Sequence, residues 1–101
     1  MPQILCKADD VPAEDPLRVE LSDGHAVAVY RWDGQFFCTD DVCSHGDASL
    51  AEGYVEDGEI FCPFHLGSFC IKTGAPRKAP CSEPIKAYPV TQDGQMLVIE
   101  R

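Results

Sequence analysis

The chain has 101 residues, enough for one domain with a modest hydrophobic core and too few for an additional catalytic domain. Its 17 acidic residues outnumber 8 basic ones, and the formal net charge of −9 argues against nucleic acid and anionic membrane surfaces as partners. The first residues lack the features of a secretory signal, and no apolar run approaches the roughly 20 residues that span a bilayer. We therefore expect a cytoplasmic protein that binds no membrane.

Turn signals divide the chain into short strands. Asp-Gly pairs, which favour tight turns between antiparallel strands, occur at 23–24, 33–34, 57–58 and 93–94. In chain order, strands are predicted at 17–21, 26–32, 35–39, as a hairpin over 53–62, and at 68–72, 85–90 and 95–100. At most one helical turn is expected, at 47–53, and no stretch keeps a 3.6-residue apolar period. The sequence predicts a small all-β fold, an antiparallel sandwich or barrel.

The cysteines suggest metal binding more than disulfides, because no export signal supports an oxidising compartment. Two of the six belong to Cys–His pairs: Cys43 and His45 in "CSH", and Cys62 and His65 in "CPFH". Each pair falls in a loop that follows a predicted strand, and a hairpin would place the two loops side by side. We expect the remaining cysteines to be small core residues or idle thiols; they are Cys6, Cys38, Cys70 and Cys81.

Two sulfur and two nitrogen ligands suit more than one metal centre. A single zinc ion accepts such a set tetrahedrally. A [2Fe–2S] cluster accepts it when two histidines replace two cysteines on one iron. Structural zinc loops usually bring a like pair from each segment, whereas here each loop brings one Cys and one His. The spacing favours the cluster, and a structural zinc-binding module is the alternative.

The two motifs resemble the Rieske [2Fe–2S] signature, C-x-H followed by C-x₂-H. The segment "CSHGDASLAEGYVEDGEIFCPFH" is similar to the cluster-binding hairpin of Rieske ferredoxins from bacterial aromatic-ring-hydroxylating dioxygenase systems. The later segments "SFCIKTGAP" and "IKAYPV" resemble the strands that follow it. The resemblance implies a single Rieske domain over 1–101, with a cluster-binding hairpin subdomain. Its cluster-binding loops would lie at about 40–76 and its proline-containing loop at about 75–84.

The resemblance implies one Rieske-type [2Fe–2S] cluster per chain, with Cys43, His45, Cys62 and His65 as ligands. It implies a soluble one-electron carrier that is not itself an enzyme. The carrier would pass electrons from a flavin-dependent ferredoxin reductase to a Rieske terminal oxygenase, binding each transiently as a monomer. The alternative is a small Rieske-like subunit of a reductase such as nitrite reductase. Acidic residues near the loops are candidates for the docking face: Asp40, Asp41, Asp47, Glu52 and Glu56.

Two positions after the second motif bear on the redox potential. In high-potential Rieske proteins, Ser and Tyr hydroxyls two and four residues after the second ligand histidine donate to cluster sulfurs. Those positions are Gly67 and Phe69 here, and neither has a side-chain donor. The resemblance therefore predicts a potential of about −150 mV, which hydroxyls added at these positions should raise. His25, after an Asp-Gly turn, is expected to be a solvated loop residue.

Overall fold

The computed structural model describes residues 2–13, 15–43, 48–63, 67–79, 81 and 83–100. The strands of this part are β1 (Pro2–Lys7), β2 (Leu17–Glu20), β3 (Ala26–Trp32), β4 (Gln35–Asp40), β5 (Tyr54–Glu56), β6 (Glu59–Phe61), β7 (Ser68–Cys70), β8 (Pro76–Lys78), β9 (Ala87–Tyr88), β10 (Val90–Asp93) and β11 (Met96–Glu100). Two single turns of 3₁₀ helix accompany them, η1 (Ala8–Asp10) and η2 (Leu50–Glu52). No helix in these residues is long and apolar enough to cross a membrane.

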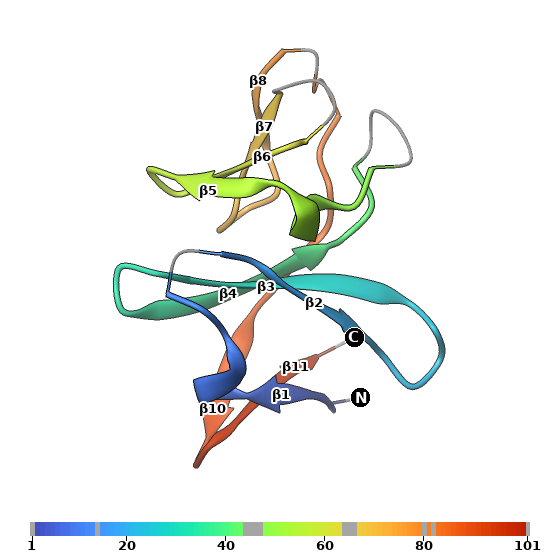
Figure 1. Cartoon of the computed structure of the whole chain (residues 1–101). Coiled ribbons are helices and arrows are strands. Elements are labelled where there is room, and N and C mark those ends of the chain that lie inside the picture. Colours follow the sequence, from blue (N-terminus) through green and yellow to red (C-terminus); the bar gives the residue numbers. More distant parts are fainter. Residues whose placement is uncertain are drawn as a thin grey trace.

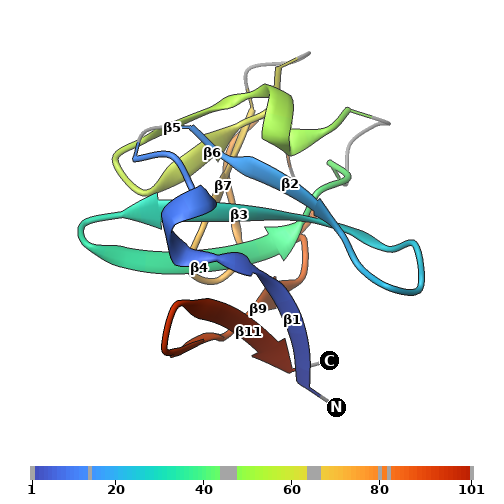
Figure 2. The same ribbon diagram turned by 60° about the horizontal axis from the view of Figure 1, so that its bottom comes forward.

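The strands form three antiparallel sheets, ordered β1-β11-β10, β2-β3-β4-β9 and β5-β6-β7-β8. In both views of the chain, β5, β6 and β7 lie on one side of β3 and β4, and β1 and β11 lie on the other (Figures 1 and 2). The β2-β3-β4-β9 sheet is thus the middle layer. The predicted all-β antiparallel class is confirmed.

The central strand β3 has both faces buried. Ala28 and Tyr30 belong to the core shared with β6 and β7, whereas Val27 and Val29 belong to the core shared with β1 and β11. All four are fully buried. A short apolar run without polar alternation suits a strand that is covered on both faces. Strand β3 therefore lies between two hydrophobic cores. The core shared with β6 and β7, called the upper core, contains Cys43 and Cys62, and the core shared with β1 and β11 is called the lower core.

The Asp-Gly turns close hairpins as predicted. Asp33 and Gly34 have φ angles of 53° and 74°, and Asp57 and Gly58 have 51° and 77°. Both central residues of each turn are therefore left-handed, as a type I′ turn requires. The turns fix the pairing of β3 with β4 and of β5 with β6.

Two strands and one boundary differ from the prediction. Strand β1 was not predicted; it pairs with β11, placing Pro2 opposite Glu100. Strand β8 was not predicted because it contains Pro76, but it lies at a sheet edge, where a missing N–H is tolerated. The predicted strand 85–90 divides at Pro89 into β9 and β10, because proline has no backbone donor to continue the ladder.

Candidate metal centre

Cys43 and Cys62 occupy equivalent places in two loops. Cys43 follows β4 and donates its backbone N–H to the Ala48 carbonyl at 3.0 Å. Cys62 follows β6 and donates its N–H to the Gly67 carbonyl at 2.8 Å. Both cysteines are buried, with exposed fractions of 2% and 0%. Two loops of equal span thus begin with a buried thiol and are closed by the same backbone hydrogen bond.

A third thiol lies against this pair. Cys81 is 5% exposed and belongs to the same buried cluster as Cys43 and Cys62. Burial, the charge of Cys43, a hydrogen bond with the Cys43 side chain and the charge of Cys62 together raise the pKa of the Cys81 thiol to about 12. Cys81 is therefore a core residue, as expected, but it also contacts the predicted ligands. The one sequence signal for this was its place in the proline-containing segment, which the resemblance puts near the cluster.

The thiols fit an iron–sulfur cluster in chemistry and position. Two buried cysteines from neighbouring loops would supply soft thiolate ligands of the kind that iron accepts in [2Fe–2S] centres. Within the described ranges, no three Cys, His, Asp or Glu side chains form a metal-binding group. The other two predicted ligands, His45 and His65, lie outside these ranges.

A buried carboxylate anchors the first loop. Asp41, two residues before Cys43, is 2% exposed. Its Oδ1 accepts a hydrogen bond from the Ala51 N–H at 2.9 Å, and its Oδ2 accepts one from the Ser49 hydroxyl at 2.7 Å. Arg18 Nε, on β2, lies 3.4 Å from Oδ2. These donors offset the desolvation cost of the buried carboxylate. Through them Asp41 connects the far end of the loop, at Ser49 and Ala51, to β4 and β2.

Close packing fixes the second loop. A Cβ placed on Gly67 would lie 2.6 Å from Cys81 Sγ and 2.9 Å from the Cys81 backbone nitrogen. The Cys81 N–H in turn donates to the Lys78 carbonyl at 3.2 Å. A serine at position 67 would therefore overlap Cys81, so the predicted effect of its hydroxyl on the potential would be accompanied by a displacement of Cys81.

Two of the acidic docking candidates are engaged in internal contacts. Asp41 is buried as described above. Asp40 Oδ1 accepts a hydrogen bond from the Tyr88 hydroxyl at 2.6 Å and lies 2.7 Å from His25 Nε2. His25 lies in a loop, as expected, and its side chain is 38% exposed, but its ring also contacts Asp40 of β4 and lies 3.4 Å from the Tyr88 hydroxyl of β9. Of the other candidates, Glu52 and Glu56 are exposed, and Asp47 lies outside the described residues.

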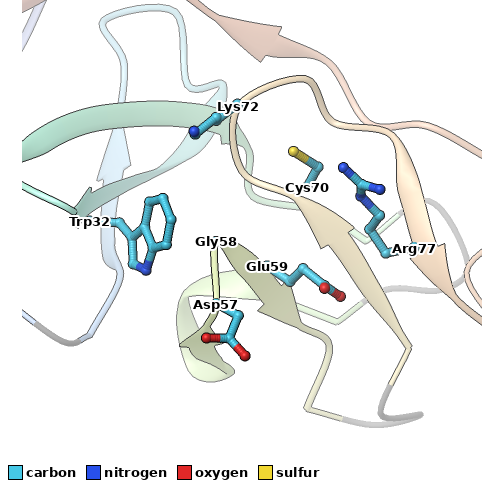
Figure 3. A pocket seen from close by; sticks show the side chains of 7 residues that line it. All are labelled: Trp32, Asp57, Gly58, Glu59, Cys70, Lys72 and Arg77. Atoms are coloured by element: carbon cyan, nitrogen blue, oxygen red, sulfur yellow. The ribbon is translucent and has the colours of Figure 1, made fainter.

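A small pocket lies at the opposite end of the β6–β7 pair. In that pair Phe61, next to Cys62, faces Ser68, whereas Glu59, next to the turn, faces Cys70. The pocket has a volume of about 150 Å³ and is lined by Trp32, Asp57, Gly58, Glu59, Cys70, Lys72 and Arg77 (Figure 3).

Cys70 is the thiol of this pocket. Burial alone would raise its pKa, but hydrogen bonds with the Thr73 side chain, the Lys72 and Thr73 backbone and the Arg77 side chain outweigh burial and lower the pKa to about 7. The strand register separates this thiol from the Cys43–Cys62 pair.

Comparison with known proteins identifies the family. Residues 1–89 match the model of the Rieske [2Fe-2S] domain, and the chain belongs to this family, whose cofactor is a [2Fe–2S] cluster. The p-cumate 2,3-dioxygenase system ferredoxin component of Pseudomonas putida is 46% identical over 97 residues, which cover 95% of this chain and 82% of that protein.

Solved structures agree with this membership. The Sphingomonas yanoikuyae B1 ferredoxin is 42% identical with a TM-score of 0.95, and the match covers 100% of this chain and 99% of that one. A chain from the complex of reduced oxygenase and oxidized ferredoxin in carbazole 1,9a-dioxygenase is 36% identical with a TM-score of 0.89, covering 97% and 91%. The predicted family is confirmed.

Proposed function

We propose that this protein is a one-electron carrier of an aromatic-ring-hydroxylating dioxygenase system. It takes electrons from a flavin-dependent ferredoxin reductase and passes them to a Rieske terminal oxygenase. The observation that carries the proposal is the meeting of Cys43 and Cys62 from two equivalent loops. Three similar proteins are named as ferredoxin components or subunits of dioxygenase systems. The carbazole complex, which joins an oxygenase and a ferredoxin, supports direct contact between the two partners.

We assign the cluster to four ligands, Cys43, His45, Cys62 and His65. When bound, the cluster supplies a reversible one-electron step. The chain holds the two thiolates in the upper core and shields them from water there. With four protein ligands on two irons, no position is left for oxygen or substrate, so the chain is a carrier and not an enzyme.

The surface near the loops suits brief contact with a partner. Val42, next to Cys43, is 55% exposed, and Tyr54 is 44% exposed. The Tyr54 ring stacks on Phe61, the neighbour of Cys62, with centroids 4.9 Å apart. Exposed apolar side chains next to Cys43, and stacked on the neighbour of Cys62, would offer the electron a short route to a partner. A small contact of this kind suits a carrier that must leave one partner to reach another.

The proposed setting is the cytoplasm, with the chain acting as a monomeric, single Rieske domain over 1–101. None of the six cysteines, all of which lie in the described part, forms a disulfide. Reduced thiols of this number are typical of a reducing compartment. The absence of a membrane-crossing helix among the described residues is compatible with this setting.

The proposal is tested by single-turnover electron transfer. The chain, loaded with its cluster and reduced, is mixed without oxygen with oxidised p-cumate dioxygenase oxygenase. We expect the visible spectrum to show the carrier being reoxidised as the oxygenase is reduced. The Cys62→Ser variant, which cannot hold the cluster, serves as the control. A loaded chain that transfers no electron to this oxygenase or to the biphenyl oxygenase contradicts the proposal.

The ionic strength of the same reaction separates two kinds of docking. If Glu52 and Glu56 form the contact, the rate falls as salt rises beyond physiological strength, where the Debye length is ~8 Å. If Val42 and Tyr54 form it, the rate changes little with salt and falls in Tyr54→Ala. The matched variant Glu56→Gln removes charge from the same strand, β5, and leaves the aromatic stack in place.

A further inference from the structure

The thiol of Cys81 is outside the ligand set and yet is buried against it. Its side chain is in the core cluster that contains Cys43 and Cys62. It forms a hydrogen bond with the Cys43 side chain. A cysteine that binds iron is a thiolate without a proton, so in the loaded protein Cys81 is the donor. This contact joins a third segment of the chain, after β8, to the thiol of the first loop.

The backbone around Cys81 is shaped to admit this side chain. Gly67 has its own carbonyl bound by the Cys62 N–H at 2.8 Å. At the same time its Cα faces Cys81 so closely that an added Cβ would lie 2.6 Å from Sγ. The Cys81 N–H is held by the Lys78 carbonyl at 3.2 Å. Cys81 is thus fixed from both sides, and its sulfur takes the space that any side chain at position 67 would need.

We propose that the Cys81 S–H donates a hydrogen bond to the ligand sulfur of Cys43 and thereby raises the midpoint potential of the cluster. This inference rests on the proposed function, since it assumes that Cys43 binds iron. A donor at a ligand sulfur stabilises the reduced cluster more than the oxidised one, because reduction places more negative charge on the sulfur. Cys81 would act through Cys43, so it is a positioning residue. Its S–H, a weak donor, gives a smaller effect than a hydroxyl.

Two other roles for Cys81 make different predictions. As a spare ligand, Cys81 would form a metal-binding group with Cys43 and Cys62. The described residues include all three of these cysteines, and they contain no such group. As a mere filler of space it would be replaceable by alanine without any change in the redox potential. Only the hydrogen-bond role predicts that the redox potential depends on whether the side chain at position 81 can donate a hydrogen bond.

The test compares Cys81→Ala, Cys81→Ser and Cys38→Ala with the wild type, each loaded with the cluster. Cys38 is an equally buried thiol in the lower core and serves as the matched control. We expect the midpoint potential to fall in Cys81→Ala, to be restored or raised in Cys81→Ser, and to be unchanged in Cys38→Ala. Equal potentials in the wild type, Cys81→Ala and Cys81→Ser overturn the inference.

An infrared measurement on the wild type keeps the inference testable if the variants fail to bind the cluster. The S–H stretching band of Cys81 should shift to lower frequency on reduction, because the Cys43 sulfur becomes a stronger acceptor. The Cys38 band should stay in place. A Cys81 band that is insensitive to the redox state overturns the inference. The proposed function fails separately, if the wild-type chain transfers no electron to the oxygenase.

Discussion

The two loops that begin at Cys43 and Cys62 are closed by the same hydrogen bond but are supported in different ways. The first ends in a polar network, in which the buried Asp41 carboxylate binds Ser49, Ala51 and Arg18. The second ends in a close contact, in which Gly67 packs on Cys81 without room for a Cβ. The difference implies that the first loop depends on hydrogen-bond partners and the second on the absence of a side chain.

The largest effect should come from the feature that the loops share. Cys43→Ser and Cys62→Ser should each abolish cluster binding, because a serine hydroxyl is a poor replacement for a thiolate on iron. Iron content and visible absorption after reconstitution measure this. Cys6→Ser, which changes a thiol in the lower core region, should load normally. Full loading of either ligand variant would remove that cysteine from the ligand set.

The polar support of the first loop should be the next most sensitive feature. Asp41→Ala leaves buried donors without a partner and should lower the free energy of unfolding by about 3 kcal/mol. Urea unfolding measures the change. The control is Glu20→Gln, which removes the other carboxylate near Arg18, an exposed one 3.6 Å away, and should cost under about 0.5 kcal/mol. Equal losses in the two variants would mean that Asp41 does not support the loop.

The tight contact of the second loop should respond to added volume. Gly67→Ala should lower the free energy of unfolding by about 2 kcal/mol, because its Cβ overlaps Cys81. The double variant Gly67→Ala with Cys81→Ala should recover part of this loss, since the Sγ contact is gone while the contact with the Cys81 nitrogen remains. Losses that simply add in urea unfolding would show that the two residues are not in contact.

The smallest expected effect concerns the pH dependence of stability in the strand pair β6–β7. A hydrogen bond from the Ser68 hydroxyl, followed by the charge of Lys78, lowers the pKa of Glu59 from its ordinary value of 4.5. A carboxyl with a depressed folded-state pKa stabilises the fold above its unfolded pKa, and this stability is lost as the pH falls through the folded value. The wild type should therefore exceed Glu59→Gln by less than about 1 kcal/mol near neutrality.

In acid this advantage should disappear, as urea unfolding between pH 7 and pH 3 would show. A difference between the wild type and Glu59→Gln that grows as the pH falls would contradict the sign of the argument.

Local signals in the sequence predicted much of the fold. The Asp-Gly turns and the apolar run of β3 are each encoded by neighbouring residues, and their hairpins formed as predicted. Strand β1 was missed because its partner β11 is at the other end of the chain. No local pattern in "PQILCK" indicates that pairing.

The same limit applies to the site. The two Cys–His motifs stand out because their spacing is unusual. The roles of Asp41 and Cys81 depend on which segments meet in space, and neither residue differs locally from an exposed acid or an idle thiol. The role of Asp41 can be recognised only when the fold places Arg18 of β2 beside it. The role of Cys81 can be recognised only when the pairing of β8 with β7 places the following segment beside the loops.

The midpoint potential of the wild-type protein tests the central claim most directly. Neither Gly67 nor Phe69 carries a hydroxyl, and Phe69 is fully buried in the apolar core. The Cys81 thiol is only a weak donor. Protein-film voltammetry at neutral pH should therefore give a value near the low end of the Rieske range, about −150 mV, suited to accepting electrons from a flavin and reducing an oxygenase. A potential well above zero would contradict the account.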